Sequence, residues 1–283
     1  MTDRGMRPEG RAGRLNFNVG VPLDYIAREP RYADLFVAQK INPELAMSAA
    51  SLDRPDRGWH EELAARFRQA GLVPSVHLPF NDLHPGSPDK LILKASRARL
   101  TKAFALARIY SPGFMVGHLD YNKELHADDY PGWRERAMDT WTAFLDAWPD
   151  SPPLYLENTY EFDPEPLADV VSGLAGRGVG VCFDVGHWHC FAQGWKRRDL
   201  ERWVKGLAPH IRVLHLHDND GSWDQHLGLG KGKIDWPAFF SLLDRYGIKS
   251  RATFEPHSEE AWTATQSFMA RRPELFGFLS IEN

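Results

Sequence analysis

The sequence has few cysteines and no long apolar run. Its 283 residues include two cysteines, and no stretch near the start resembles a signal peptide. Two thiols cannot form the disulfide framework typical of small secreted domains, so we expect a reducing, cytoplasmic setting. No segment approaches the roughly eighteen uninterrupted apolar residues that a membrane span needs. These absences exclude a disulfide scaffold and a membrane-spanning protein.

An excess of positive charge is also absent. The chain carries 34 lysine and arginine residues against 38 aspartate and glutamate residues, a formal net charge of −4, and the two signs are mixed along its length. A polyanionic partner usually faces a basic patch, so a nucleic-acid substrate gains no support. We expect a small-molecule substrate, and the sequence does not indicate an oligomeric state.

No low-complexity linker or shift in composition divides the chain. Residues 1–14, MTDRGMRPEGRAGR, are rich in glycine and arginine and have little to bury, so we expect a disordered extension there. With 43% hydrophobic residues, the chain can bury a full core. Residues 15–283 are therefore expected to form one domain.

From Leu15 onward, short apolar runs alternate with longer segments of helical spacing. This alternation is typical of βα units. Expected strands cover 15–19, about 44–47, 72–77, 113–118, 153–157, 179–184, 211–216 and 251–255. Expected helices cover 22–28, 59–70, 89–110, 132–147, 165–175, 199–207, 236–246 and 259–270. The pattern predicts an α/β fold, a (β/α)8 TIM barrel, which typically needs about 250 residues.

Six of the expected strands end in a residue that can bind a metal ion. These are His77, His118, Glu157, Asp184, His215 and Glu255. In a barrel the carboxyl ends of the strands converge on one mouth, where barrel enzymes keep their chemistry. Three further candidates follow in loops: His187, Asp224 and His226. Nitrogen and oxygen donors without a thiolate suit Zn²⁺ or Mn²⁺, and carboxylates can bridge neighbouring ions.

Each of these residues also has an ordinary structural explanation. A single histidine at a strand end is usually a hydrogen-bonded structural residue, Glu157 can pair with a lysine, and Asp184 can cap the following turn. The joint pattern favours a metal site, because the structural explanations would have to hold independently at six strands. In the stretch VCFDVGHWHC, Cys182 shares the face of Asp184 one layer deeper, which predicts core filling and excludes a zinc knuckle.

Seven motifs carry a resemblance to a known family. They occur in order along residues 15–270: VHLPF, VGH, LEN, FDVGH, LHLHDN, DQHLGLGKGKIDW and TFEPH. In them the chain resembles the xylose isomerase-like barrel superfamily, which contains the endonuclease IV type of apurinic endonucleases and many sugar isomerases and epimerases. The resemblance implies a TIM barrel and a divalent-metal cofactor, Zn or Mn, with up to three ions per chain.

The resemblance also implies roles for individual residues. The ligands of endonuclease IV correspond to His77, His118, Glu157, Asp184, His187, His215, Asp224, His226 and Glu255, and all nine positions are filled here. By analogy Glu157 bridges two ions. His77 and His118 complete one, and Asp224 with His226 completes another. The isomerases and epimerases need a single ion and four residues, corresponding to Glu157, Asp184, His215 and Glu255.

Two departures separate the chain from the repair enzyme. Phe80 and Asn81 stand where endonuclease IV carries residues that wedge into DNA, and Lys231 stands where its glycine loop carries an acidic residue. The basic surface that would follow DNA is missing as well. The resemblance therefore supports the site better than it supports a nucleic-acid substrate.

Two reactions fit the expected residues. In the first, water activated by a metal cluster hydrolyses a phosphoester of a small molecule. In the second, a sugar or sugar phosphate is isomerised or epimerised around one ion, and Glu157 and Glu255 act as base and acid. We favour hydrolysis, because isomerisation does not need the other ligands. A non-catalytic binding protein with a structural metal is a third possibility, which the intact ligand set disfavours.

Four residues are candidates for contact with the substrate. Phe80 follows His77 closely and can form a pocket wall. Trp188 and Trp223 sit beside proposed ligands and can stack on a sugar ring or a base. Lys231 can meet a phosphate or a carboxylate. Loop packing explains the tryptophans at least as well, and solvation is the alternative for the lysine.

Three more residues lie near the proposed ligands in the sequence. Strand alternation turns His217 to the same side as His215. Asp218 is a candidate for holding a ligand histidine through its other ring nitrogen. His257, which follows the last expected strand, is expected to be a surface residue.

Overall fold

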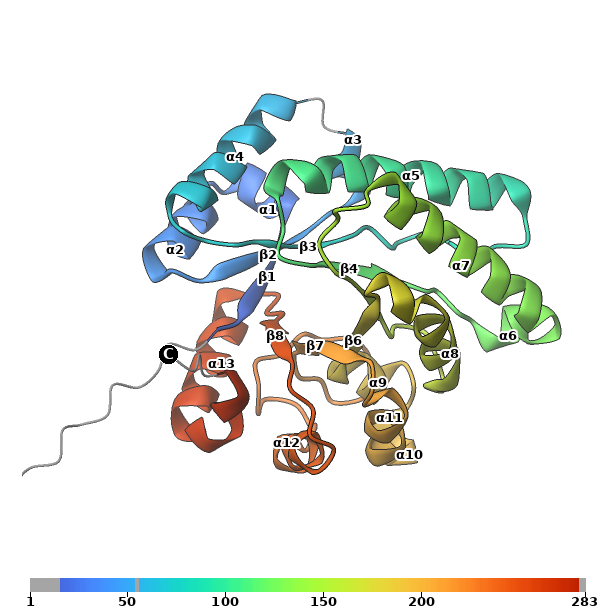
Figure 1. The fold of residues 1–283 in the computed structure, drawn as a ribbon. Coiled ribbons are helices and arrows are strands. Elements are labelled where there is room, and N and C mark those ends of the chain that lie inside the picture. Colours follow the sequence, from blue (N-terminus) through green and yellow to red (C-terminus); the bar gives the residue numbers. More distant parts are fainter. Residues whose placement is uncertain (1–15, 54–55, 280–283) are drawn as a thin grey trace, which may run out of the picture.

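The eight expected strands form a closed parallel barrel with helices around it (Figure 1). The computed structural model describes residues 16–53 and 56–279, so the extension expected over residues 1–14 lies outside the described residues. The strands are β1 (Asn18–Pro22), β2 (Asn42–Ala46), β3 (Ser75–His77), β4 (Met115–His118), β5 (Leu154–Glu157), β6 (Gly180–Asp184), β7 (Ile211–Leu216) and β8 (Arg251–Phe254). They pair in chain order, and β1 pairs with β8. This architecture confirms the predicted (β/α)8 TIM barrel.

All eight expected helices are present. They are α1 (Leu23–Arg28), α4 (Arg57–Gln69), α5 (Lys90–Tyr110), α7 (Tyr130–Ala147), α8 (Glu165–Leu174), α11 (Leu200–Leu207), α12 (Trp236–Arg245) and α13 (Glu259–Arg271). The connections contain further helices that the sequence pattern did not reveal: α2 (Arg31–Gln39), α3 (Ala49–Asp53), α6 (Lys123–His126), α9 (Val185–Cys190) and α10 (Gly194–Arg197), with 3-10 segments at Ala127–Asp129, Ala175–Arg177 and Pro273–Leu279. Within the described residues, no helix combines the length and hydrophobicity needed to cross a bilayer.

Local signals in the sequence set the ends of several elements. The carboxylate of Asp56 accepts a hydrogen bond of 3.0 Å from the backbone N–H of Trp59 and so caps α4. Asp89 caps α5 in the same way. The third strand begins at Ser75, later than expected, because Pro74 has no backbone N–H to contribute to the sheet. Capping and proline placement thus explain where these elements begin.

The register of the strands places the expected ligands at one level of the barrel. His118 in β4 pairs with Glu157 in β5, and Asp184 in β6 pairs with His215 in β7. An apolar cluster fills the interior beneath them, formed by Phe114, Val116, Tyr155, Cys182 and Val213. Cys182 lies one layer below Asp184, is buried and forms no disulfide, which confirms it as core filling. The site therefore rests on a packed apolar floor.

The seam that closes the barrel is short. β1 pairs with β2 from Asn18 to Pro22, whereas its pairing with β8 covers Asn18 and Val19. The next residue of β1 is Gly20, and a Cβ added there would lie 3.4 Å from Cγ of Glu255. One expected ligand therefore stands directly beside the seam between the first and last strands.

Candidate metal centre

The nine residues expected to bind metal lie together at the carboxyl ends of the strands. Seven of them are buried: His77, His118, Glu157, Asp184, His187, His215 and His226. The other two, Asp224 and Glu255, are partly exposed. The fold thus brings all nine side chains to one mouth, where two carboxylates remain accessible.

Glu157 stands at the centre of the group. Its Oε2 lies 3.3 Å from Nε2 of His77 and 3.5 Å from Nε2 of His118. The same oxygen is 3.3 Å from Nδ1 of His215, and Oε1 is 3.0 Å from Nδ1 of His187. Four imidazoles from four different elements therefore surround one fully buried carboxylate.

Asp224, in the loop after β7, is the centre of a second group of histidines. Its Oδ2 lies 2.9 Å from Nε2 of His226 and 3.4 Å from Nε2 of His187. His187 links the two groups, because it also contacts Glu157. The backbone of His226 has a φ of 48°, a left-handed conformation that is uncommon for a residue other than glycine and often marks a functional site.

The chain fixes the orientation of four of the five histidines through Nδ1. The acceptors are the carbonyl of Leu78 for His77 (3.2 Å), the hydroxyl of Thr159 for His118 (2.6 Å), the carbonyl of Asn158 for His187 (2.9 Å) and the carbonyl of Glu255 for His226 (2.9 Å). In the neutral imidazole, an Nδ1–H that donates to such an acceptor leaves Nε2 unprotonated. This arrangement is typical of histidines that bind metal through Nε2.

The site fits a divalent cation. Both oxygens of Glu157 are buried, and neither has a hydrogen-bond partner among the described residues. Such a charge is costly to bury unless a cation balances it. Ligand atoms within 4.8 Å of one another form overlapping groups, among them His77, Glu157 and His215, and Glu157, Asp184 and His187. The shared carboxylate and the nitrogen and oxygen donors suit neighbouring Zn²⁺ or Mn²⁺ ions.

Electrostatic effects separate the two candidate catalytic carboxyl groups. Burial raises the pKa of Glu157, but the surrounding histidines, His215 foremost, outweigh burial, and the pKa lies well below its ordinary value. The pKa of Glu255 is raised, because burial and the Glu157 carboxylate together outweigh the opposite effect of His215. Burial lowers the pKa of His118 to about 3, which keeps this imidazole neutral, as metal binding requires.

Glu44 in β2 supports the site, although the sequence pattern did not reveal it. Its buried Oε1 lies 2.8 Å from Nε2 of His215, while Nδ1 of that ring faces Glu157. Ser75 and Thr253 donate hydrogen bonds of 2.8 and 2.9 Å to Oε2 of Glu44. A carboxylate on the far nitrogen of a metal-binding histidine fixes the ring and strengthens it as a ligand. The available signal was an acidic residue inside the apolar run NPELAM.

Comparison with known families identifies the family of this barrel. The profile of a family described as "Xylose isomerase-like TIM barrel" matches residues 36–272. The chain belongs to this family. The match extends from α2 to α13, so it includes seven of the eight strands and every residue of the candidate metal centre.

The relatives of this xylose isomerase-like barrel include proteins named for two different reactions. Probable endonuclease 4 of Mycobacterium tuberculosis is 24% identical over 185 residues, 61% of this chain and 69% of the relative. An uncharacterized protein of Methanocaldococcus jannaschii is 26% identical over 187 residues, 64% of this chain and 63% of the relative. The chain spans less than two thirds of the length of the first curated relatives it matches. The solved structure of a D-tagatose 3-epimerase-like protein shares the fold, with a TM-score of 0.69, 20% identity and coverage of 93% of this chain and 98% of that one.

Phe80 lies against two of the expected ligands in this xylose isomerase-like barrel. The centroid of its ring is 4.3 Å from that of His118 and 5.7 Å from that of His77. The ring is partly exposed. Phe80 therefore forms an apolar wall at the mouth, beside the histidines of β3 and β4.

Trp223 and Lys231 lie exposed in the loop between β7 and α12. Asp218 organises this loop: its carboxylate accepts hydrogen bonds of 2.8 Å from the backbone N–H of Gly230 and of 3.0 Å from the indole of Trp236. The proposed role of Asp218 in holding a ligand histidine is therefore replaced by a role in shaping the loop. The loop presents Trp223 next to Asp224, with 62% of Trp223 exposed.

Trp188 is turned away from the mouth. Its side chain is buried, and Nε1 donates a hydrogen bond of 3.1 Å to Asp199. The indole packs so closely on Gly194 that a Cβ there would lie 2.3 Å from it. An indole covered in this way has no free face for a substrate, so the structure does not bring Trp188 together with the other candidates.

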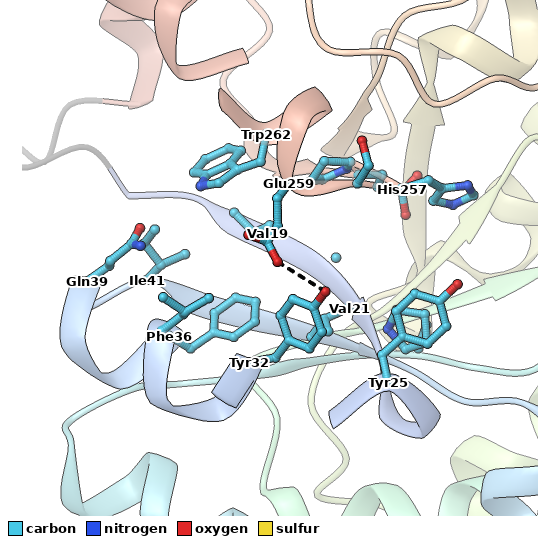
Figure 2. A pocket seen from close by; sticks show the side chains of 17 residues that line it. Val19, Val21, Tyr25, Tyr32, Phe36, Gln39, Ile41, His257, Glu259 and Trp262 are labelled. Atoms are coloured by element: carbon cyan, nitrogen blue, oxygen red, sulfur yellow. Dashed lines mark hydrogen bonds between the residues drawn. The ribbon is translucent and has the colours of Figure 1, made fainter. Parts of the chain in front are cut away.

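A largely apolar pocket of about 300 Å³ adjoins the metal centre (Figure 2). Its walls come from β1, α2, α13 and residues at the two ends of β2, among them Val21, Phe36, Ile41 and Trp262. A hydrogen bond of 3.4 Å from the hydroxyl of Tyr32 to Oε1 of Glu259 joins α2 to α13 across it. Glu255 also lines this pocket, together with Val19 and Gly20 of β1. The pocket therefore lies between the proposed ligands and the β1–β8 seam.

Proposed function

We propose that this chain is a metal-dependent hydrolase that acts on a phosphoester of a small molecule. The observation that carries the proposal is the convergence of all nine expected ligands, with four imidazoles within 3.5 Å of the Glu157 carboxylate. A single-ion isomerase needs four of the nine. A hydrolase in which several ions act together on a phosphate needs further ligands. The imidazoles of His77 and His118 and the Asp224 group would supply them.

The contacts indicate how Zn²⁺ or Mn²⁺ ions would be shared. His77, His118 and Glu157 would hold one ion. A second would lie among Glu157, Asp184, His215 and Glu255, and a third among His187, Asp224 and His226. When bound, such ions lower the pKa of a water molecule and neutralise charge on the phosphate oxygens.

Residues outside the ligand set would position the substrate. Phe80 offers an apolar wall beside His118, and the exposed Lys231 and Trp223 stand on the loop that carries Asp224. The apolar pocket beside Glu255 would receive the part of the substrate that does not contact the ions. With a net charge of −4, the chain has no general attraction for a nucleic acid.

Purified protein is expected to carry more than one zinc or manganese ion per chain, because the ligand groups overlap without being identical. Elemental analysis of protein purified without a chelator measures the ratio. Turnover of bis(p-nitrophenyl) phosphate by the same sample tests the reaction. A ratio of one ion per chain would contradict the hydrolase and favour the isomerase.

One observation favours a sugar isomerase or epimerase as the second candidate. Oε2 of Glu157 and Oε1 of Glu255 lie 3.3 and 3.2 Å from the same atom, Nδ1 of His215. The two carboxylates therefore lie side by side, and their pKa values are shifted in opposite directions. Such a pair can act as base and acid on adjacent carbons of a sugar held by one ion.

The substitution Leu35→Asp is expected to weaken binding of aryl phosphodiesters. Leu35 lines the apolar pocket from α2, away from the ligands. Losing about 1.5–3 kcal/mol of apolar burial raises the KM for bis(p-nitrophenyl) phosphate roughly tenfold to hundredfold, while kcat is unchanged. Steady-state kinetics measures both constants. The control is Leu125→Asp on α6, which is 72% exposed and outside the pocket; equal KM values in the two variants would refute the role of the pocket.

A further inference from the structure

Glu161 is a buried acidic residue outside the nine proposed ligands. It lies in the loop after β5, and 1% of its surface is exposed. Burial raises the pKa of Glu161 to about 7, and hydrogen bonds from backbone N–H groups oppose the shift. A buried carboxylate is costly, and proteins tolerate such a cost mainly at functional sites. The position of Glu161 therefore points to a role in the neighbouring site.

The two oxygens of Glu161 accept hydrogen bonds from two different loops. Oε2 accepts from the backbone N–H of Thr159 at 2.7 Å, and Oε1 accepts from the backbone N–H of Tyr121 at 3.0 Å. Thr159 is two residues beyond Glu157, and Tyr121 is three residues beyond His118. One carboxylate therefore joins the loops that leave β5 and β4, the strands that end in two adjacent ligands.

The bond from Tyr121 follows an unusual backbone conformation. Asp120 has a φ of 56°, in the left-handed region that few residues other than glycine adopt. Such a conformation persists where the surrounding contacts hold it. The hydrogen bond from Tyr121 to Glu161 is one of these contacts. Glu161 therefore helps to fix the direction in which the chain leaves His118.

Thr159 connects Glu161 to a proposed ligand. Its hydroxyl oxygen lies 2.6 Å from Nδ1 of His118 and accepts the hydrogen bond that orients that ring. Nε2 of the same ring lies 3.2 Å from Nε2 of His77 and 3.5 Å from Oε2 of Glu157. Glu161 thus holds the backbone of Thr159, while the side chain of Thr159 holds His118.

We propose that Glu161 is a positioning residue that keeps Nε2 of His118 directed at the ion shared with His77 and Glu157. This inference rests on the proposed function in assuming that those three residues hold an ion. Glu161 acts through the backbone of Thr159 and is not itself a ligand. Groups that orient a metal-binding histidine through its other nitrogen typically contribute about tenfold to hundredfold to metal affinity.

Glu161→Gln tests this role with little change in shape. The amide keeps one oxygen for one N–H, but its NH2 group must face the other N–H, so one of the two hydrogen bonds is lost. Zinc-loaded protein is dialysed against a series of chelator concentrations, and elemental analysis measures the zinc that remains. Glu161→Gln is expected to bind one zinc per chain roughly threefold to tenfold more weakly than the wild type, since it acts one step behind Thr159.

The control for this variant is Glu124→Gln, which makes the same chemical change at an exposed position of α6. Its zinc retention should equal that of the wild type. Retention in Glu161→Gln that equals that of Glu124→Gln would overturn the proposal.

A second pair of variants does not depend on how Glu161→Gln folds. Thr159→Val removes the hydroxyl that faces His118 and keeps the shape of the side chain, whereas Thr159→Ser keeps the hydroxyl. Thr159→Val should weaken retention of the same zinc about tenfold, and Thr159→Ser should retain it like the wild type. Equal retention in the two variants would show that the hydroxyl does not hold His118, which contradicts the proposal.

The His118→Ala background identifies the ion that responds. This variant is expected to lack the ion that Glu161 supports, so adding Glu161→Gln should cause no further loss of zinc. A further loss in the double variant would place the effect of Glu161 elsewhere and overturn the proposal. Failure of the hydrolase is recognised separately. If the variants retain zinc as expected but the wild type does not turn over bis(p-nitrophenyl) phosphate, hydrolysis is refuted and the assignment of Glu161 is supported.

Discussion

Glu157→Gln is expected to abolish phosphodiester hydrolysis and to release metal. The amide keeps the shape of the side chain but removes the charge that lies within 3.5 Å of four histidines. Losing the charge stabilisation that the shared ions provide, several kcal/mol, corresponds to a rate loss of about 10³-fold. Turnover of bis(p-nitrophenyl) phosphate and elemental analysis measure the two effects in one preparation.

The control for this substitution is Glu124→Gln. Glu124 lies exposed on α6, so the same chemical change occurs outside the site. Metal content and turnover of this variant should equal those of the wild type. If Glu157→Gln also retained the wild-type metal content and rate, Glu157 would not be the ligand that the ions share, and the central assignment would be wrong.

His118→Ala is expected to separate the two candidate reactions. His118 has no counterpart among the four ligands of a single-ion isomerase, but it contacts Glu157 and would complete an ion in the hydrolase. Its loss should lower phosphodiester turnover by at least about 10²-fold, equivalent to some 3 kcal/mol, and remove one ion per chain. Epimerisation of a panel of ketoses, assayed in parallel, should not fall below the wild-type level.

His84→Ala is the matched variant for this experiment. His84 is also paired with a carboxylate, that of Asp120, but it lies outside the nine ligands. Its removal therefore tests whether loss of any histidine near β3 and β4 is enough to stop the reaction. Unchanged phosphodiester hydrolysis in His118→Ala would contradict the role of His118 in completing an ion needed for hydrolysis, whatever the behaviour of His84→Ala.

The convergence of the ligands could be predicted from the sequence because two simple rules cooperate. Side chains alternate along a strand, and the carboxyl ends of barrel strands meet at one mouth. His118 and Glu157 end separate apolar runs, and the register then sets them side by side. For these positions the local sequence pattern and the geometry of the barrel both place the side chain at the mouth.

Other members of the site depend on contacts that no local pattern encodes. Glu44 lies on β2 and His215 on β7, so their 2.8 Å contact spans the barrel interior and appears only when the barrel closes. His217 follows the end of β7, and its contact with Asp184 depends on the space left at Gly186. A run of residues shows the chemistry of each side chain but not which distant strand it will face.

Trp188 illustrates the opposite case, in which neighbours in sequence diverge in space. In an extended loop, Trp188 would follow His187 to the mouth. Residues 185–190 instead form α9, where successive side chains point about 100° apart around the axis. His187 therefore faces Glu157, while Trp188 packs against Gly194 and donates its N–H to Asp199.

The short seam between β1 and β8 means that the site is complete only when the first and last strands have paired. Glu255 follows directly on β8, and its carbonyl accepts the hydrogen bond that orients His226. Until the last strand has docked, the centre lacks one carboxylate and one histidine is free to rotate. An ion that binds only the folded chain stabilises it by mass action, so the proposed ions would reach their full affinity only once β1 and β8 have paired. Uptake of the proposed ions would thus distinguish a closed barrel from one whose first and last strands have not yet paired.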